Sequence, residues 1–136
     1  MHAIARAIIT TTSVAGLTSL VLAADMTGAD IKALLSGKTV YLETTAASAT
    51  GKAGEGVIYS AEDGTVLYKT PTGAIWHGKV EVKGNTACFD WKERPNNPCV
   101  RYDKSGEVVT VIDAASGATR AKVVKTAPGN AEKLSP

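Results

Sequence analysis

The sequence has few of the residues from which enzyme active sites are built. Its 136 residues include two histidines and two cysteines, and one of the histidines is His2. Nucleophilic catalysis needs a base beside the nucleophile, and a metal centre needs clustered histidine, cysteine or carboxylate ligands. No serine lies in a Gly-x-Ser-x-Gly elbow, and the cysteines are not spaced Cys-x-x-Cys. We therefore expect a non-enzymatic protein with no catalytic residue, no metal and no cofactor.

The N-terminal segment over 1–24 also lacks acidic residues. Arg6 is the only Lys or Arg before Lys32. An uncharged stretch over 7–24 follows and ends in small residues, which is typical of a signal peptide spanning 1–23. Cleavage after Ala23 would place Val21 and Ala23 at the −3 and −1 positions. A retained membrane anchor is the alternative, because about 18 uncharged residues just suffice to cross a bilayer.

Cleavage would leave 24–136 as a single domain without a strong charge of either sign. It removes one of the 15 basic residues and none of the 13 acidic residues, so the formal net charge falls from +2 to +1. Such a balance provides no field to attract nucleic acid or an anionic membrane surface. We expect a periplasmic or secreted protein that neither binds nucleic acid nor inserts stably into a membrane after cleavage.

The two cysteines, Cys88 and Cys99, both lie in the predicted mature domain, with ten residues between them. An even number of cysteines in an exported chain favours a disulfide. A covalent link also suits a domain whose core is poor in aromatic residues, with one Phe, two Trp and four Tyr. We predict a structural Cys88–Cys99 disulfide.

One short helix is indicated over 28–36. Thr27 is a suitable N-cap with Asp30 three residues later, which resembles a capping box. Ile31 begins an i, i+3, i+4 apolar stripe, and Gly37 stands where a helix C-terminal glycine belongs. We expect this helix to lie across an end or an open face of a sheet.

The remainder of the domain alternates between strand-like runs and turn signals. A stretch of small residues at 46–56 predicts a flexible loop, and its Gly51–Gly56 glycines do not have the spacing of a phosphate-binding loop. Tight turns join antiparallel neighbours, so the pattern predicts an all-β antiparallel meander, closed into a small barrel or left open as a half-barrel. The expected strands are 39–45, 56–60, 65–70, 74–83, 86–91, 99–103, 107–114 and 118–126.

Aromatic side chains on the predicted strands are the one indication of a binding site. They are either simply the core or the lining of a cavity or groove for an apolar ligand or a partner segment. This candidate ligand or partner surface comprises Tyr59, Tyr68, Trp76, Phe89, Trp91 and Tyr102.

The order of several motifs resembles that of a family of small exported bacterial proteins known only as a domain of unknown function. The resemblance spans about residues 34–130, and the lysine-rich segment and the Pro-Asn-Asn-Pro loop do not match the family. It implies an exported, disulfide-bonded β-domain and carries over no catalytic residue. The motifs are Asp63-Gly64, Gly73-x-x-Trp76-x-Gly78-x-Val80, Gly84-x-x-x-Cys88-x-x-Trp91, Cys99-x-x-Tyr102, Asp113 followed by Gly117, and Gly129-Asn130.

The function that these observations favour is an exported binding module for a small apolar ligand or an envelope protein partner, including inhibition of an exported enzyme. Two alternatives remain. One is an enzyme with a shallow site around His77, the one histidine left after cleavage, which we otherwise expect to be an ordinary surface residue between Lys79 and Glu81. The other is a structural component of the envelope.

Overall fold

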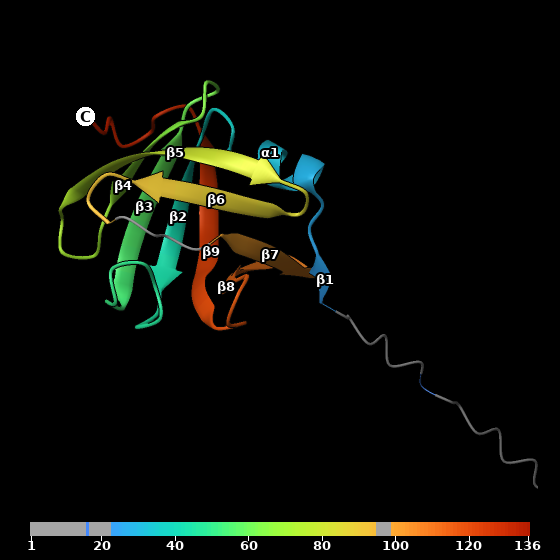
Figure 1. Ribbon diagram of the computed structural model, residues 1–136. Coiled ribbons are helices and arrows are strands. Elements are labelled where there is room, and N and C mark those ends of the chain that lie inside the picture. Colours follow the sequence, from blue (N-terminus) through green and yellow to red (C-terminus); the bar gives the residue numbers. More distant parts are fainter. Residues whose placement is uncertain (1–15, 17–22, 95–98) are drawn as a thin grey trace, which may run out of the picture.

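The computed structural model describes Gly16 and residues 23–94 and 99–136 of the chain (Figure 1). The predicted signal peptide therefore lies almost wholly outside the described residues, and so does the Pro-Asn-Asn-Pro loop. The elements are β1 (Ala24–Asp25), α1 (Gly28–Leu35), β2 (Lys38–Thr44), β3 (Gly54–Ser60), β4 (Thr65–Lys69), β5 (Ile75–Lys83), β6 (Thr86–Trp91), β7 (Val100–Ser105), β8 (Val108–Asp113) and β9 (Thr119–Pro128).

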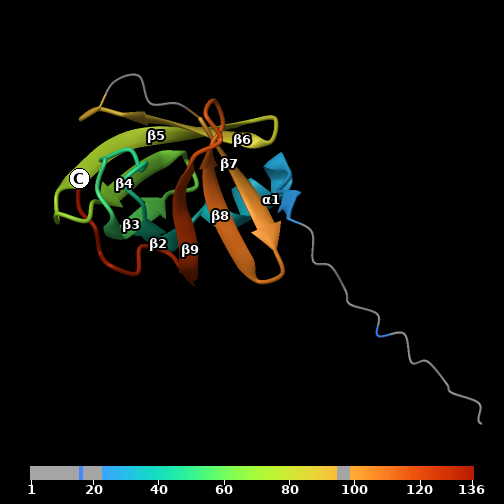
Figure 2. The ribbon, with the colours of Figure 1, turned by 90° about the horizontal axis from the view of Figure 1, so that it is seen from below.

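The strands form an all-β antiparallel meander, as predicted, and this meander closes into a barrel. Strands β2 to β9 follow one another around it as a meander, and β9 returns to pair with β2 along most of its length. Figure 2 shows β9 between β2 and β8, where this closure occurs. The half-barrel alternative is therefore wrong. The short strand β1 adds to the edge of β7, with Asp25 opposite Asp103.

The helix α1 covers one end of the barrel (Figure 1). Its capping box is present, because Asp30 N–H donates to Thr27 Oγ1 at 3.2 Å and Thr27 N–H donates to Asp30 Oδ2 at 3.4 Å. Ile31 and Leu35 are buried against the barrel, and Gly37 has a φ of +68° at the turn into β2. The amphipathic pattern thus predicted both the helix and the face that it buries.

The barrel is closed least firmly between β6 and β7. Their ladder consists of one residue pair, Ala87 and Val100, whereas β5 and β6 share six pairs. The predicted disulfide between Cys88 and Cys99 is present beside this pair, with the two Cα atoms 4.1 Å apart. The covalent link therefore reinforces the seam that has the fewest backbone hydrogen bonds.

The predicted flexible loop over 46–56 is partly wrong. Strand β3 already begins at Gly54, and the connection over 45–53 is a series of hydrogen-bonded turns. Ser48 N–H donates to Thr45 O at 3.0 Å, Gly51 N–H donates to Ser48 O at 2.9 Å, and the Ser48 hydroxyl donates to Lys52 O at 2.9 Å. Small hydroxyl side chains bond readily to nearby backbone groups, and such bonds join the turns of this segment.

Candidate functional site

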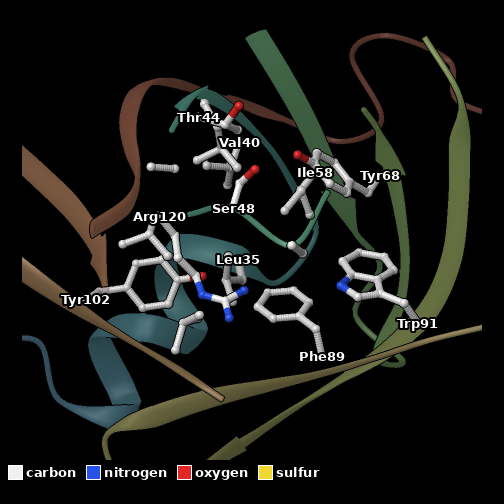
Figure 3. Close-up of a pocket in the computed structure, with 15 residues that line it drawn as sticks. Leu35, Val40, Thr44, Ser48, Ile58, Tyr68, Phe89, Trp91, Tyr102 and Arg120 are labelled. Carbon is white, nitrogen blue, oxygen red and sulfur yellow. The ribbon is translucent and has the colours of Figure 1, made fainter. Parts of the chain in front are cut away.

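A cavity of about 60 Å³ lies inside the barrel. Every strand except β1 and β5 contributes to its wall, and α1 contributes Leu35. The 45–53 loop contributes Ser48 and Ala49 to the lining. This loop follows β2 at the end of the barrel away from α1 (Figure 1). Most of the lining is apolar, and Figure 3 shows the side chains converging from all sides on the same space.

Four aromatic side chains form one wall of the barrel interior. Phe89 and Trp91 are two residues apart on β6 and therefore face the same side, where their rings stack with centroids 5.5 Å apart. Trp91 also contacts Tyr68 on β4 at 5.6 Å and Trp76 on β5 at 6.1 Å. Offset and edge-on contacts of this kind fix ring positions beyond simple burial. We call Tyr68, Trp76, Phe89 and Trp91 the aromatic wall.

The structure separates the six predicted aromatic residues into three groups. Tyr68, Phe89, Trp91 and Tyr102 are buried and line the cavity. Trp76 packs behind them against the core, half-buried. Tyr59 does not line the cavity, since it follows the cavity-lining Ile58 on β3 and faces the other side of the sheet.

Tyr68 reaches the cavity because its ring crosses a glycine. A Cβ atom placed on Gly56 would lie 2.8 Å from Tyr68 Cε2 and 3.1 Å from its hydroxyl oxygen. Burial raises the pKa of the Tyr68 hydroxyl to about 12, and a hydrogen bond with Thr50 acts in the opposite direction. This hydroxyl is therefore a neutral group at physiological pH.

The polar side chains of the cavity gather at the end covered by the 45–53 loop. One row of paired residues runs from Tyr102 on β7 through Val111 and Ala121 to Thr44 on β2. Thr44 Oγ1 lies 2.9 Å from Lys52 O and 2.8 Å from Gly54 O, so its donor is used. The cavity thus has an apolar, aromatic body and a polar end.

Arg120 reaches this polar end through a β-bulge. Val111 pairs with Ala121 and Ile112 pairs with Thr119, so Arg120 is the extra residue between them. Bulges change the direction of a side chain, and Arg120 points into the cavity beside its neighbour Ala121 (Figure 3). The sequence alone did not indicate Arg120 as a cavity residue, because no local pattern marks the bulge.

Asp113, the last residue of β8, neutralises Arg120. Arg120 Nε and Nη2 donate to Asp113 Oδ2 at 3.1 and 2.6 Å, and both side chains are only 12–13% exposed. The other carboxylate oxygen accepts from the backbone N–H groups of Ala115 and Ser116 at 2.9 and 3.1 Å. The Arg120 hydrogen bonds, followed by these backbone donors, hold the pKa of Asp113 below its usual range.

His77 lies outside the barrel, away from the cavity, and its partner is not one that we predicted. Its ring Nδ1 is 2.5 Å from Glu93 Oε1, and its backbone N–H donates to Glu93 Oε2 at 2.8 Å. Partial burial raises the pKa of Glu93, but the hydrogen bonds from His77 outweigh it and hold that pKa below its usual value. Among the described residues no hydroxyl or thiol hydrogen-bonds to His77, so the pair ties β5 to the residues after β6.

Two further observations concern the described part of the chain. Within 23–94 and 99–136, no three His, Cys, Asp or Glu side chains are grouped so that they could hold a metal ion. No helix in these residues combines the length and the hydropathy that a membrane span requires.

Comparisons of the chain with protein-family models, with curated proteins and with solved structures gave no match.

Proposed function

We propose that this protein is an exported, non-enzymatic binding protein that takes a small apolar ligand into its barrel. The observation that carries the proposal is the cavity itself. A closed barrel holds an apolar space whose wall includes four buried aromatic residues, Tyr68, Phe89, Trp91 and Tyr102. Small-molecule sites in proteins are typically concave, mostly apolar and provided with a few polar groups.

The size of the cavity limits the ligand. Its volume of about 60 Å³ is smaller than the roughly 150 Å³ of an engineered apolar cavity that binds benzene. Binding of a ring-sized molecule therefore requires the cavity to widen. Among the described residues, only Ser48 and Ala49 line the cavity from outside the strands and α1, so a shift of the 45–53 loop would widen it without breaking a strand ladder.

A protein partner fits the same aromatic residues less well. Four of the six are between 3 and 8% exposed, so they offer no surface to a docking chain. Tyr59 and Trp76 are half-buried and face opposite sides of the sheet. The aromatic residues therefore favour a ligand inside the barrel over a partner outside it.

Export is supported by the disulfide, because such bonds form and persist in oxidising compartments outside the cytoplasm. We propose a periplasmic or secreted location reached through the 1–23 signal peptide. The intact mass of protein recovered from its host should correspond to 24–136. Recovery of the full-length chain from membranes would instead indicate a retained anchor.

Ligand binding can be tested with ethylbenzene as an apolar probe, followed by amide chemical shifts in NMR titration. We expect saturable shifts in the strands that line the cavity. Ala121→Leu fills the cavity from β9 and should abolish them, because Ala121 is 3% exposed and lines the cavity. Ala115→Leu makes the same chemical change in an exposed turn and should leave binding unchanged.

Absence of saturable binding to the wild-type protein would refute a cavity ligand of this class. Equal binding by the two leucine variants would place the probe elsewhere on the protein and would also refute a ligand in the cavity.

A further inference from the structure

Two polar side-chain groups that line the cavity, the Tyr102 hydroxyl and the Trp91 indole N–H, have no hydrogen-bond partner among the described residues. Tyr102 is 3% exposed, and its hydroxyl makes no hydrogen bond with any of the described residues. Burial alone raises the pKa of Tyr102, with no hydrogen bond contributing to the shift. The other hydroxyls of the cavity differ, since those of Thr44 and Ser48 bond to the backbone of Lys52.

The Tyr102 hydroxyl is not among the fully buried unpartnered side-chain atoms of the described residues, where only Ser60 Oγ stands, so it opens onto the cavity. It is therefore available to a bound molecule, because polar groups inside proteins are nearly always hydrogen-bonded. Tyr102 belongs to the row of residues that includes Ala121 and Thr44, next to the bulge that turns Arg120 inward. In Figure 3 the Tyr102 hydroxyl points into the cavity, on the side where the Arg120 guanidinium lies. A ligand whose apolar part lies against the aromatic wall would present its own polar group here.

The charge at this end selects among polar groups. The Arg120 guanidinium is paired with Asp113 at 2.6 Å, so the two together carry no net charge. A carboxylate that approached Arg120 would also meet the carboxylate of Asp113, and an ammonium group would meet the guanidinium. A neutral oxygen faces neither penalty, and a phenol can donate to it.

We propose that the ligand is a neutral, largely apolar molecule with one carbonyl or hydroxyl oxygen, and that the Tyr102 hydroxyl binds this oxygen. This inference rests on the proposed function and adds the chemical class of the ligand. A site built to hydrogen-bond an oxygen rejects the analogue that lacks it, because the protein group is then left unpaired.

Three probes of similar size separate the possibilities. Ethylbenzene has no polar group, acetophenone replaces one methylene group with a carbonyl, and benzoate carries a charge. We expect acetophenone to bind the wild-type protein about three- to tenfold more tightly than ethylbenzene, as one neutral hydrogen bond would give. Benzoate should bind most weakly.

Tyr102→Phe removes only the hydroxyl and should abolish the preference for acetophenone while leaving the affinity for ethylbenzene unchanged or higher. Tyr59→Phe makes the same change outside the cavity and should alter neither affinity. Asp113→Asn should raise the affinity for benzoate relative to acetophenone, because Arg120 then lacks its counter-charge.

The ranking of the probes by the wild-type protein decides the matter even if a variant folds poorly. Equal affinities for ethylbenzene and acetophenone would overturn the role of Tyr102, although the cavity would still bind apolar ligands. Tightest binding of benzoate would instead make Arg120 an anion receptor and overturn the neutral class. Failure of all three probes would count against the proposed function itself.

Discussion

Replacing both cysteines, as Cys88→Ser with Cys99→Ser, removes the covalent link at the barrel's weakest seam. The disulfide joins residues that are 11 positions apart, beside the single pair of the β6–β7 ladder, Ala87 and Val100. In the chain-entropy account, releasing a loop of about 12 residues lowers the free energy of unfolding by roughly 2–3 kcal/mol. For a domain of this size that corresponds to a drop in melting temperature of about 8–15 °C.

The assay is thermal unfolding followed by circular dichroism, with and without reductant. The double variant and the reduced wild-type protein should melt at the same lower temperature and keep their β-sheet signal when folded, because the other ladders do not depend on the disulfide. Reductant should not affect the double variant, which is the internal control. A drop of less than about 3 °C, well under 1 kcal/mol, would refute the view that the disulfide holds this seam.

Three further substitutions test other parts of the structure. Asp113→Asn should lower the free energy of unfolding by about 1–2 kcal/mol at neutral pH. The folded-state pKa of Asp113 is lowered, so its contribution to the free energy of unfolding is complete above pH of about 4 and is lost as the pH falls further. Urea unfolding at pH 7 and pH 2.5 should therefore show a smaller difference in stability between the wild-type protein and the variant in acid. Gly56→Ala should destabilise by about 1–3 kcal/mol in the same assay, because the new Cβ would crowd Tyr68, and unchanged stability would mean that the ring moves freely. His77→Ala should lower the free energy of unfolding by less than about 1 kcal/mol, as loss of a half-exposed ion pair does, and should leave binding of the probes intact. Loss of a function with the fold preserved would favour an enzyme that uses His77.

The strand positions were predictable because their turns carry strong local signals. Gly64 and Gly84 adopt φ values of +91° and +58°, which other residues rarely do, and they lie in the β3–β4 and β5–β6 turns. Tight turns of this kind leave only antiparallel neighbours, so the meander followed from the spacing alone. Closure of the barrel did not follow from the spacing, because the pairing of β2 with β9 joins segments about 80 residues apart. That pairing depends on the twist accumulated around the barrel.

The cavity was predictable only in part, for a related reason. Strict alternation along a strand correctly puts Phe89 and Trp91 on one face, and the hydrophobic pattern makes that face the interior. Alternation by itself cannot say that Tyr59 faces outward, since an aromatic residue is acceptable on either side of a sheet. It also fails where a strand contains a bulge, and for that reason Arg120 escaped notice.

The bulge at Arg120 has consequences for the whole polar end of the barrel. Turning a guanidinium inward would be costly without a nearby anion, and Asp113 supplies one from the end of the neighbouring strand. Asp113 is fixed in turn by the backbone N–H groups of the 114–118 turn. The pair is thereby rigid and neutral, so it ends the apolar interior without giving the cavity a charge. A hydroxyl left unpaired beside such a neutral boundary, as in Tyr102, is suited to an oxygen that carries no charge.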